Sequence, residues 1–412
     1  MAVVKPFSCI RPTGELVDRI AALPYDVYNR SEAKEEVTRE PLSFLSIDRA
    51  ETSFDDSVDT YDDRVYQKAK ELLSDYIAKG YFIKDDMECY YLYELIMNGR
   101  SQTGFVACAS IDDYQNNIIK KHEKTRADKE LDRIRHVDTC NAQTGPIFLS
   151  YPSNEILHDI MKEAKVKESI YSFRSKDGIT HNVWRIDEDG MISRIKDAFS
   201  HINHIYIADG HHRAASAVAV GNLRREQNKD YDGSEEFNYF LSVFFPEDEL
   251  MILPYNRVVR DLNGYSVDEF IEKVKERFYI GHVDYPYEPD EKGSFGMHLD
   301  NKWYKIKIKE DYTIKEDPVK ALDVSILQDN LLEPILGILD PRVDNRIDFI
   351  GGIRGIKELE KRVATDMEVA FSMYPTTMRE LFKVSDENKL MPPKSTWFEP
   401  KLRSGLFIHS LE

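Results

Sequence analysis

The chain has 412 residues, with 56 Lys and Arg against 74 Asp and Glu, which gives a formal net charge of −18 at pH 7. This acidic balance excludes a basic nucleic-acid coat, because nucleic-acid binders carry a contiguous positive patch. A composition of 42% hydrophobic and 32% charged residues excludes a disordered or fibrous chain, and the length predicts two or three domains.

The first part of the chain has clear helix and strand signals. Apolar residues at helical spacing predict a helix over 59–79 that ends at Gly80. Runs rich in Tyr, Val and Ile predict strands over 89–97 and 104–111, and Asn98-Gly99 between them favours a hairpin turn because both residues tolerate positive φ. A strand pair is therefore expected directly after the helix.

A highly charged run follows. Residues 120–137 predict a helix with one narrow buried stripe formed by Leu131, Ile134 and Val137. A short apolar strand is then expected over 147–149.

The most informative junction lies further on, after a predicted helix over 155–165. Residues 204–208 predict a short apolar strand, Asp209-Gly210 a turn, and 211–220 a helix that ends at Gly221. A strand, a tight turn and a helix in this order form an anion-binding geometry, because the first N–H groups of a helix have no intrahelical partner.

The rest of the chain continues as mixed α/β. We expect strands over 240–245 and 303–308 and a helix over 267–278, and an ordered loop near the proline-rich end.

These elements predict two regions. We expect residues 1–260 to form a nucleotide- or phosphate-binding core with insertions, and residues 261–412 to form a C-terminal α+β region whose last segment, 391–412, packs back on the core.

Cysteine usage and the N-terminus predict the compartment. The four cysteines lie far apart without CxxC or Cys/His ligand spacing, so we expect reduced thiols rather than disulfides or a structural zinc site. The first twenty residues lack an uninterrupted apolar stretch, and no run approaches the length of a membrane span. A soluble, cytoplasmic protein is expected.

Two short motifs carry candidate chemistry. In Asp209-Gly-His-His-Arg213, Gly210 lets the backbone approach a ligand, and the two histidines and Arg213 supply donors for phosphate or one metal ligand. The alternative is an ordinary helix cap by Asp209 with solvated histidines.

In His122-Glu-Lys-Thr125, Glu123 is a candidate general base and Lys124 a phosphate partner, and the alternative is a solvated helical face. The motif is not HExxH, because Arg126 stands at the last position, so a zincin metalloprotease is excluded.

Two weaker candidates lie outside these motifs. Asp26 follows a rigid turn at Pro24, and Lys394 follows Pro392-Pro393. A residue such as Asp26 is more often part of a turn than a catalyst, and the Ser395-Thr396 pair that follows Lys394 is typical of a turn cap.

These motifs and several other segments together resemble those of one known family. The chain resembles a bacterial and archaeal family catalogued as a domain of unknown function, through six segments in order: 23–27, 41–45, 122–125, 209–213, 323–334 and 391–396. The turn at 209–213 is similar to the phosphate-binding box of the ParB/sulfiredoxin superfamily, which includes free L-serine kinases. The resemblance implies an α/β (α+β) fold with a ParB/sulfiredoxin-like core around the 209–213 helix and an additional mixed α/β C-terminal region.

The resemblance implies an enzyme, a phosphotransferase that uses ATP or ADP with Mg²⁺ to phosphorylate a small hydroxyl substrate, with free L-serine as the leading acceptor. Candidate catalytic residues are Glu123, Lys124 and Asp26, with the base either Glu123 or Asp26. The candidate nucleotide- or phosphate-binding residues are Asp209, Gly210, His211, His212, Arg213 and Lys394, and Asp209 is also the candidate metal ligand.

Other functions and partners stay open at this point. The alternatives are a non-catalytic, ParB-like nucleotide-binding regulatory module and a metal-dependent hydrolase using His211 and His212. The expected partners are a nucleotide and a serine-like small molecule, with a homodimer left open, no membrane and no nucleic acid.

The two motifs are far apart in sequence, and each is incomplete alone. Phosphoryl transfer requires a base and a phosphate cradle within one substrate length, on the order of 10 Å. We therefore predict that Glu123 and Lys124 face the Asp209–Arg213 turn across one cleft, with Asp26 or Lys394 on its rim.

Overall fold

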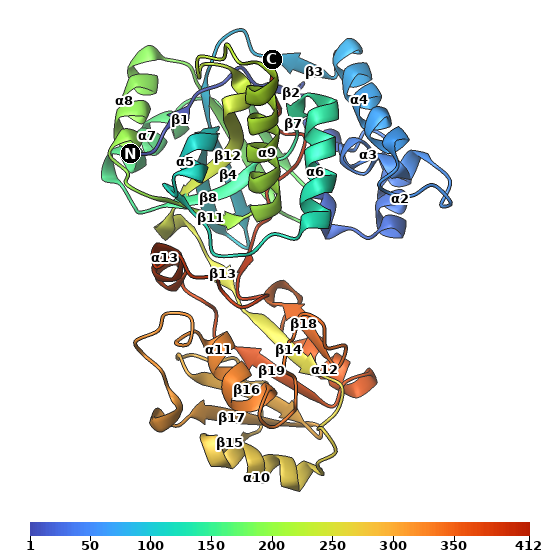
Figure 1. Ribbon diagram of the computed structural model, residues 1–412, viewed down its shortest axis with the longest axis vertical. Helices are drawn as coiled ribbons and strands as arrows, with labels where there is room; N and C mark the ends of the chain where they lie inside the picture. Colours follow the sequence, from blue (N-terminus) through green and yellow to red (C-terminus); the bar gives the residue numbers. More distant parts are fainter. The chain divides into compact units, whose positions relative to one another are not determined.

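A computed structural model describes residues 1–412 and has an α+β fold, as the sequence predicts. The chain forms two compact units (Figure 1). The first unit contains residues 1–250 and 400–412, and the second contains residues 251–399.

The first unit is built on a mixed nine-stranded sheet. Its strands are β1 (Val4–Lys5), β4 (Tyr90–Met97), β5 (Arg100–Ser110), β6 (Ile119–Lys120), β8 (Ile147–Tyr151), β9 (Tyr171–Arg174), β10 (Thr180–Ile186), β11 (Ile205–Asp209) and β12 (Tyr239–Pro246). The order is β6-β11-β8-β12-β5-β4-β10-β9, and β1 also pairs with β5. Two pairs are parallel, β6 with β11 and β8 with β12, and the others are antiparallel.

Helices cover this sheet because their apolar faces need a partner. They are α1 (Val17–Ile20), α2 (Arg30–Arg39), α3 (Leu45–Asp48), α4 (Asp63–Ala78), α5 (Ile111–Gln115), α6 (Ala127–Cys140), α7 (Glu155–Lys165), α8 (Asp189–Ser200) and α9 (His211–Gln227). Helices α7 and α8 pack against each other and place Leu157, Ile195 and Phe199 in the main core beside the strands. Helix α6 packs against α9 and also against α4 (Figure 1).

The last residues of the chain complete the first unit. Strand β21 (His409–Ser410) pairs with β7 (Ala142–Gln143), and a second small sheet joins β2 (Ile10–Pro12) to β3 (Phe82–Lys84). Phe407 is buried and its ring contacts those of Tyr91 and Tyr93 on β4. The residues after Lys401 are therefore part of the core.

The second unit has an antiparallel six-stranded sheet with the order β15-β17-β16-β19-β14-β18. Its strands are β13 (Ile252–Leu253), β14 (Tyr255–Val259), β15 (Phe278–Val283), β16 (Ser294–Leu299), β17 (Lys302–Ile308), β18 (Ile347–Gly351), β19 (Val369–Met373) and β20 (Trp397–Phe398), of which β13 and β20 form a separate pair. Its helices are α10 (Val267–Arg277), α11 (Asp323–Leu327), α12 (Ile356–Thr365) and α13 (Met378–Asp386). Leu359 of α12 lies in its core with Val258 and Trp303.

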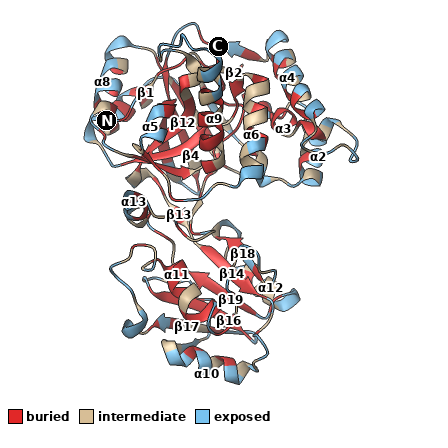
Figure 2. Cartoon of the chain, in the orientation of Figure 1, coloured by how far each residue is buried: buried red, intermediate tan, exposed pale blue.

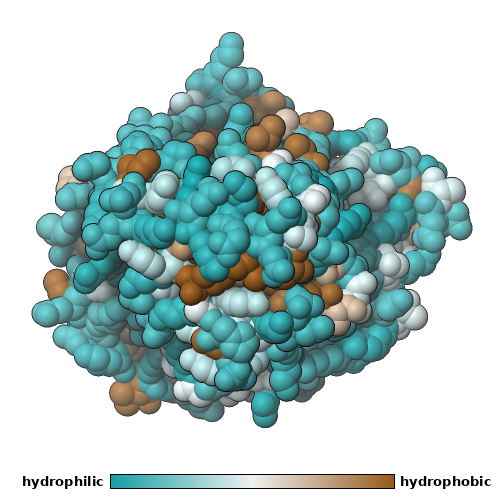
Figure 3. Space-filling model, turned by 90° about the horizontal axis from the view of Figure 1, so that it is seen from below, coloured by the Kyte–Doolittle hydropathy of each residue, from teal (hydrophilic) through white to brown (hydrophobic).

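Burial follows the expected pattern. The strands of both sheets are largely buried and the outer helix faces are exposed (Figure 2). Hydrophilic residues cover most of the face drawn in Figure 3, and hydrophobic residues form smaller patches between them. No helix has both the length and the apolar composition that a membrane span requires.

Several predicted elements are confirmed, with small changes at their ends. The helix predicted over 59–79 is α4, the hairpin is β4–β5, and Asn98 and Gly99 both have positive φ. Strand β5 begins at Arg100, earlier than the predicted 104, because the polar residues there still pair with β4.

The helix predicted over 120–137 is partly wrong. Lys120 belongs to β6, residues 121–126 form a loop, and α6 begins only at Ala127. The predicted buried stripe is wrong at Leu131, which is 57% exposed, whereas Ile134 and Val137 are half-buried. The helix instead buries polar residues. Arg133 and His136 line a polar cavity described below, and Asp132 accepts from the Tyr66 hydroxyl at 2.8 Å.

The helix predicted over 211–220 continues to Gln227, so the predicted end at Gly221 is wrong. Gly221 is in the middle of the helix because its missing side chain allows close packing. A Cβ there would lie 2.5 Å from the Phe237 carbonyl oxygen and 2.7 Å from Ile111 Cδ1.

Candidate functional site

The sheet brings the two sequence motifs to one edge. Strands β6 and β11 are parallel neighbours, with Ile119 opposite Ile205 and Lys120 opposite Tyr206. Parallel strands end on the same side of a sheet, where the loops that follow them meet. The 122–125 motif and the 209–213 turn follow directly after these two strands.

Side chains of the 209–213 turn contact the 122–126 loop. The backbone N–H of His122 donates to His211 Nε2 at 3.4 Å, and that of Arg126 donates to His212 Nδ1 at 3.4 Å. A carboxylate oxygen of Glu123 lies 3.7 Å from His211 Nδ1. The structure therefore places Glu123 beside the turn, as a shared site requires.

Helix α9 begins without a side-chain cap. Gly210 is its N-cap, with φ 94° and ψ 31°, a left-handed conformation that glycine adopts without steric cost. Ser216 Oγ donates to the His212 carbonyl at 2.7 Å and to the Glu130 carbonyl at 3.0 Å, which ties α9 to α6. The N-terminus of a long, well-anchored helix is thus presented beside the loop.

Asp209 does not cap the helix at N2 or N3. Its carboxylate accepts from the Gly210 backbone N–H at 2.8 Å and forms an ion pair with Lys401, also at 2.8 Å. Burial raises the pKa of Asp209, but the charges of Lys401 and Arg213 outweigh burial and hold that pKa well below its usual range. Asp209 is therefore a carboxylate at any physiological pH, and its role as a metal ligand remains a prediction.

Sequence reasoning did not find Lys401. It follows Pro400 in the terminal segment, where the only signal was the expectation that this stretch is ordered. Its partner is 192 residues earlier in the chain, and no local pattern reports such a contact.

The histidines of the site are uncharged at neutral pH. His122 is 2% exposed and His211 is 5% exposed, and their rings meet edge to face with centroids 4.4 Å apart. Burial lowers the pKa of His122 to about 4. Burial, and then the neighbouring His122, lower the pKa of His211 well below its usual value, and burial also lowers that of His212. These side chains offer N–H donors and nitrogen lone pairs rather than positive charge.

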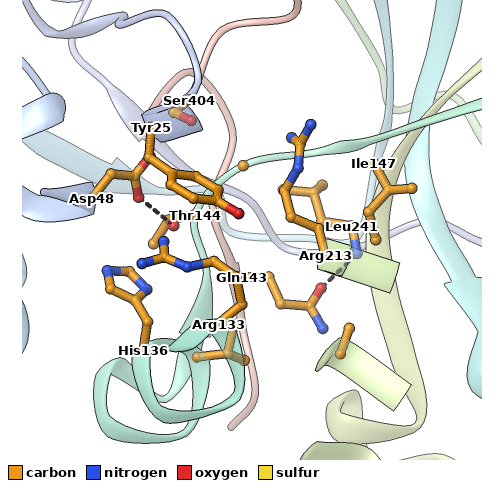
Figure 4. A pocket seen from close by; sticks show the side chains of 13 residues that line it. Tyr25, Asp48, Arg133, His136, Gln143, Thr144, Ile147, Arg213, Leu241 and Ser404 are labelled. Atoms are coloured by element: carbon orange, nitrogen blue, oxygen red, sulfur yellow. Dashed lines mark hydrogen bonds between the residues drawn. The ribbon is translucent and has the colours of Figure 1, made fainter. Parts of the chain in front are cut away.

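Arg213 lines a small polar cavity next to the turn (Figure 4). Its guanidinium donates to the Pro146 carbonyl at 2.7 Å. The cavity has a volume of about 30 Å³, enough for a buried water molecule. It is lined by Tyr25, Asp48, Arg133, His136, Val137, Gln143, Thr144, Gly145, Ile147, Arg213, Ala217, Leu241 and Ser404. A nucleotide needs far more space than this, on the order of hundreds of Å³.

The polar groups of the cavity hold one another. Thr144 Oγ1 donates to Asp48 at 2.9 Å, and the Arg133 guanidinium lies 4.0 Å from the centre of the Tyr25 ring. Sequence reasoning missed Asp48, Arg133 and Thr144. The signal that was available is the row of polar residues on α6 that includes Arg133.

Three predicted residues remain, Lys124, Asp26 and Lys394. Lys124 is exposed on the loop, and Asp26 is exposed in a short 3-10 turn, Tyr25–Val27. The negative charge of Asp26 acts to raise the pKa of His212, although burial lowers it more, which puts Asp26 within electrostatic reach of the turn. Lys394 belongs to the second unit, where its ammonium lies 5.4 Å from the centre of the Tyr255 ring. The roles of all three remain predictions.

Comparison with known proteins identifies a family. A family model described as "Protein of unknown function (DUF1015)" matches residues 4–325. No curated protein matches the chain.

Three solved structures illustrate the likeness to known folds. A mutant of a free serine kinase in complex with ADP is 14% identical with a TM-score of 0.35, and the match covers 71% of this chain and 87% of that one. SbnI with a C-terminal truncation, from Staphylococcus aureus, is 10% identical with a TM-score of 0.37 and coverages of 71% and 82%. A conserved hypothetical protein from Pyrococcus furiosus is 15% identical with a TM-score of 0.33 and coverages of 73% and 93%. Similarity at this level does not assign an activity.

Proposed function

The chain belongs to the DUF1015 family, and we propose that it is a phosphotransferase that uses ATP or ADP to phosphorylate a small hydroxyl substrate, with free L-serine as the acceptor and O-phosphoserine as the product. The observation that carries this proposal is the 3.7 Å approach of Glu123 to His211 at the start of α9. It puts a candidate base beside a candidate phosphate cradle.

The cradle is the N-terminus of α9. Its first N–H groups have no intrahelical acceptor and no side chain caps them, so they suit phosphate oxygens. Arg213 is one turn into the helix, and Lys124 is on the facing loop. In a chain of net charge −18, these cations and the helix dipole favour an anion at this point.

Asp209 is the residue that would hold Mg²⁺. It is ionised, and Mg²⁺ is usually bound by one or two carboxylates together with phosphate oxygens and waters. Bound there, Mg²⁺ would neutralise part of the phosphate charge. Mg²⁺ would share this carboxylate with Lys401, whose ammonium lies 2.8 Å from it.

A carboxylate would receive the acceptor proton. The acceptor oxygen forms a bond to the terminal phosphorus of the nucleotide, the bond to the bridging oxygen breaks, and the hydroxyl proton passes to Glu123 or Asp26. Glu123 is better placed by its contact with the turn. Its side chain is 57% exposed, so an acceptor reaches it from solvent.

The test is an assay of the purified full chain with ATP or ADP, Mg²⁺ and L-serine, with phosphoserine measured by mass spectrometry. L-Threonine and glycerol serve as alternative acceptors. We expect Glu123→Gln to reduce turnover far more than nucleotide affinity, because it removes an interaction needed in the transition state.

A matched pair of arginine variants tests the cradle. Arg213→Ala is expected to weaken nucleotide binding, whereas Arg224→Ala, near the other end of α9 and ion-paired with Asp138, is not. Absence of both phosphoserine and nucleotide binding would contradict the proposal. Nucleotide binding without transfer to any acceptor would favour a regulatory module instead.

A further inference from the structure

Three side chains at the site form a second kind of donor group. One potential ligand atom from each of His122, Glu123 and His211 lies within 4.8 Å of the other two. The group contains two imidazoles and one carboxylate, drawn from the two loops that follow β6 and β11. It does not include Asp209.

One nitrogen of this group is buried without a partner. His122 Nδ1 is inaccessible to solvent and makes no hydrogen bond. The same ring hydrogen-bonds to the backbone of Ile207, which leaves Nδ1 of the neutral ring with a lone pair. Buried polar atoms are almost always satisfied, so this lone pair is available to a ligand.

The ring is arranged as a metal ligand usually is. Metal-binding histidines commonly donate their other N–H to a backbone carbonyl, which fixes the tautomer and the ring orientation. The hydrogen bond of His122 to Ile207 corresponds to that second contact.

His211 makes only long contacts within this group. His211 Nε2 accepts from the His122 backbone N–H at 3.4 Å, and its Nδ1 lies 3.7 Å from the Glu123 carboxylate. Both distances are at or beyond the limit of a good hydrogen bond, so little is lost when metal bonds replace them.

We propose that His122, Glu123 and His211 bind one divalent transition metal ion, Zn²⁺ or an ion of similar preference. Two nitrogens and one carboxylate oxygen suit Zn²⁺, whereas Mg²⁺ prefers oxygen ligands alone. Donors around tetrahedral Zn²⁺ lie roughly 3.4 Å apart, so the three side chains close by about 1 Å on binding. The exposed side chain of Glu123 supplies most of that movement.

Three protein ligands leave a fourth position for water. A catalytic zinc site has this composition, and the metal lowers the pKa of its bound water toward neutrality. The site is open to solvent on the Glu123 side. This inference does not depend on the proposed phosphotransferase activity. Glu123 acts as the acceptor base only in the metal-free form, because a carboxylate bound to the metal does not take up the proton.

The test measures metal rather than activity. Full-length protein without a histidine tag is loaded with Zn²⁺, passed through a desalting column and assayed for metal content, and a parallel sample is titrated with Co²⁺ and followed by its visible absorption. We expect about one equivalent of Zn²⁺, Co²⁺ bands of a low-coordinate site, and no competition from millimolar Mg²⁺.

Two variants close together in the chain provide the comparison. Glu123→Gln removes one negative charge and a ligand, and Asp128→Asn removes one negative charge from an exposed residue outside the group. We expect Glu123→Gln to weaken Zn²⁺ binding about tenfold or more, and Asp128→Asn to leave it unchanged.

His211→Gln should weaken binding in the same way. Because His211 is buried, the melting temperature of this variant is recorded alongside, and Glu123→Gln keeps the test valid if His211→Gln does not fold. Failure of the wild-type protein to bind Zn²⁺ or Co²⁺, or equal affinity of the Glu123 and Asp128 variants, would overturn the assignment.

Discussion

Replacing Gly210 with Ala separates backbone strain from the role of Arg213. Gly210 has φ +94°, and a Cβ built there lies 3.3 Å from Nε and Nη2 of Arg213. Gly233 is a matched control, because its φ is +95° and a Cβ would meet nothing within 4 Å. Both substitutions place an alanine at nearly the same positive φ, and only the first also brings a Cβ against the guanidinium.

The expected stability loss is similar for the two variants. A left-handed alanine costs about 1–2 kcal/mol, and the reduced entropy of the unfolded chain offsets about 0.4–1 kcal/mol of it. The free energy of unfolding should therefore fall by about 1 kcal/mol in each variant, which lowers the melting temperature by about 2–4 °C for a unit of this size.

Nucleotide affinity is expected to separate them. Moving Arg213 weakens a charge-assisted hydrogen bond to phosphate, so Gly210→Ala should reduce affinity about tenfold by calorimetric titration while Gly233→Ala leaves it unchanged. A Gly210→Ala, Arg213→Ala double variant should bind no more weakly than Arg213→Ala. Equal affinity of the two single glycine variants would refute the placement of phosphate at this turn.

Two further outcomes follow from buried titratable groups. Burial raises the pKa of Asp323 to about 7, although its carboxylate accepts from the Gly293 backbone N–H. The folded state therefore binds the proton of this group more tightly than the unfolded state does. This difference stabilises the fold by on the order of 4 kcal/mol below pH 4, and the stabilisation is lost as the pH rises from about 4 through 7. Asp323→Asn should flatten this pH dependence in calorimetric melts of the full chain, and an unchanged profile would contradict the argument. The four cysteines are unpaired and buried, and burial raises the pKa of each thiol; a thiol reagent should label native protein slowly and all four sites after unfolding, and rapid labelling of native protein would show an accessible thiolate.

The sequence was informative where the deciding interactions are local. The strand before α9 and the start of α9 were predicted because Asp209-Gly210 is a turn signal between two apolar runs. The hairpin at Asn98-Gly99 was predicted because both residues tolerate the positive φ of a tight turn. The contact between the two motifs was predicted on chemical grounds. Its cause is the pairing of β6 with β11, which joins residues more than eighty positions apart.

Other features could not be predicted for physical reasons. Lys120 joins a sheet and Gly221 lies inside a helix because of neighbours that are distant in sequence. The buried face of α6 contains Asp132, Arg133 and His136. Apolar periodicity assigns the apolar face of a helix to the core, so it predicts the wrong buried face for this one. These polar residues are buried because tertiary contacts enclose the cavity around Arg133 and Asp48, and no local pattern in the sequence reports those contacts.

The ion pair between Asp209 and Lys401 can form only late in the synthesis of the chain. Its partners are 192 residues apart, and the whole of the second unit is translated between them. At about 5–20 residues per second, roughly 10–40 s pass between the two. During that time the ribosome has already released the strands on which the 209–213 turn is built, while the lysine that neutralises Asp209 and the strand that pairs with β7 do not yet exist. Nascent protein therefore completes its first unit only after its second has emerged.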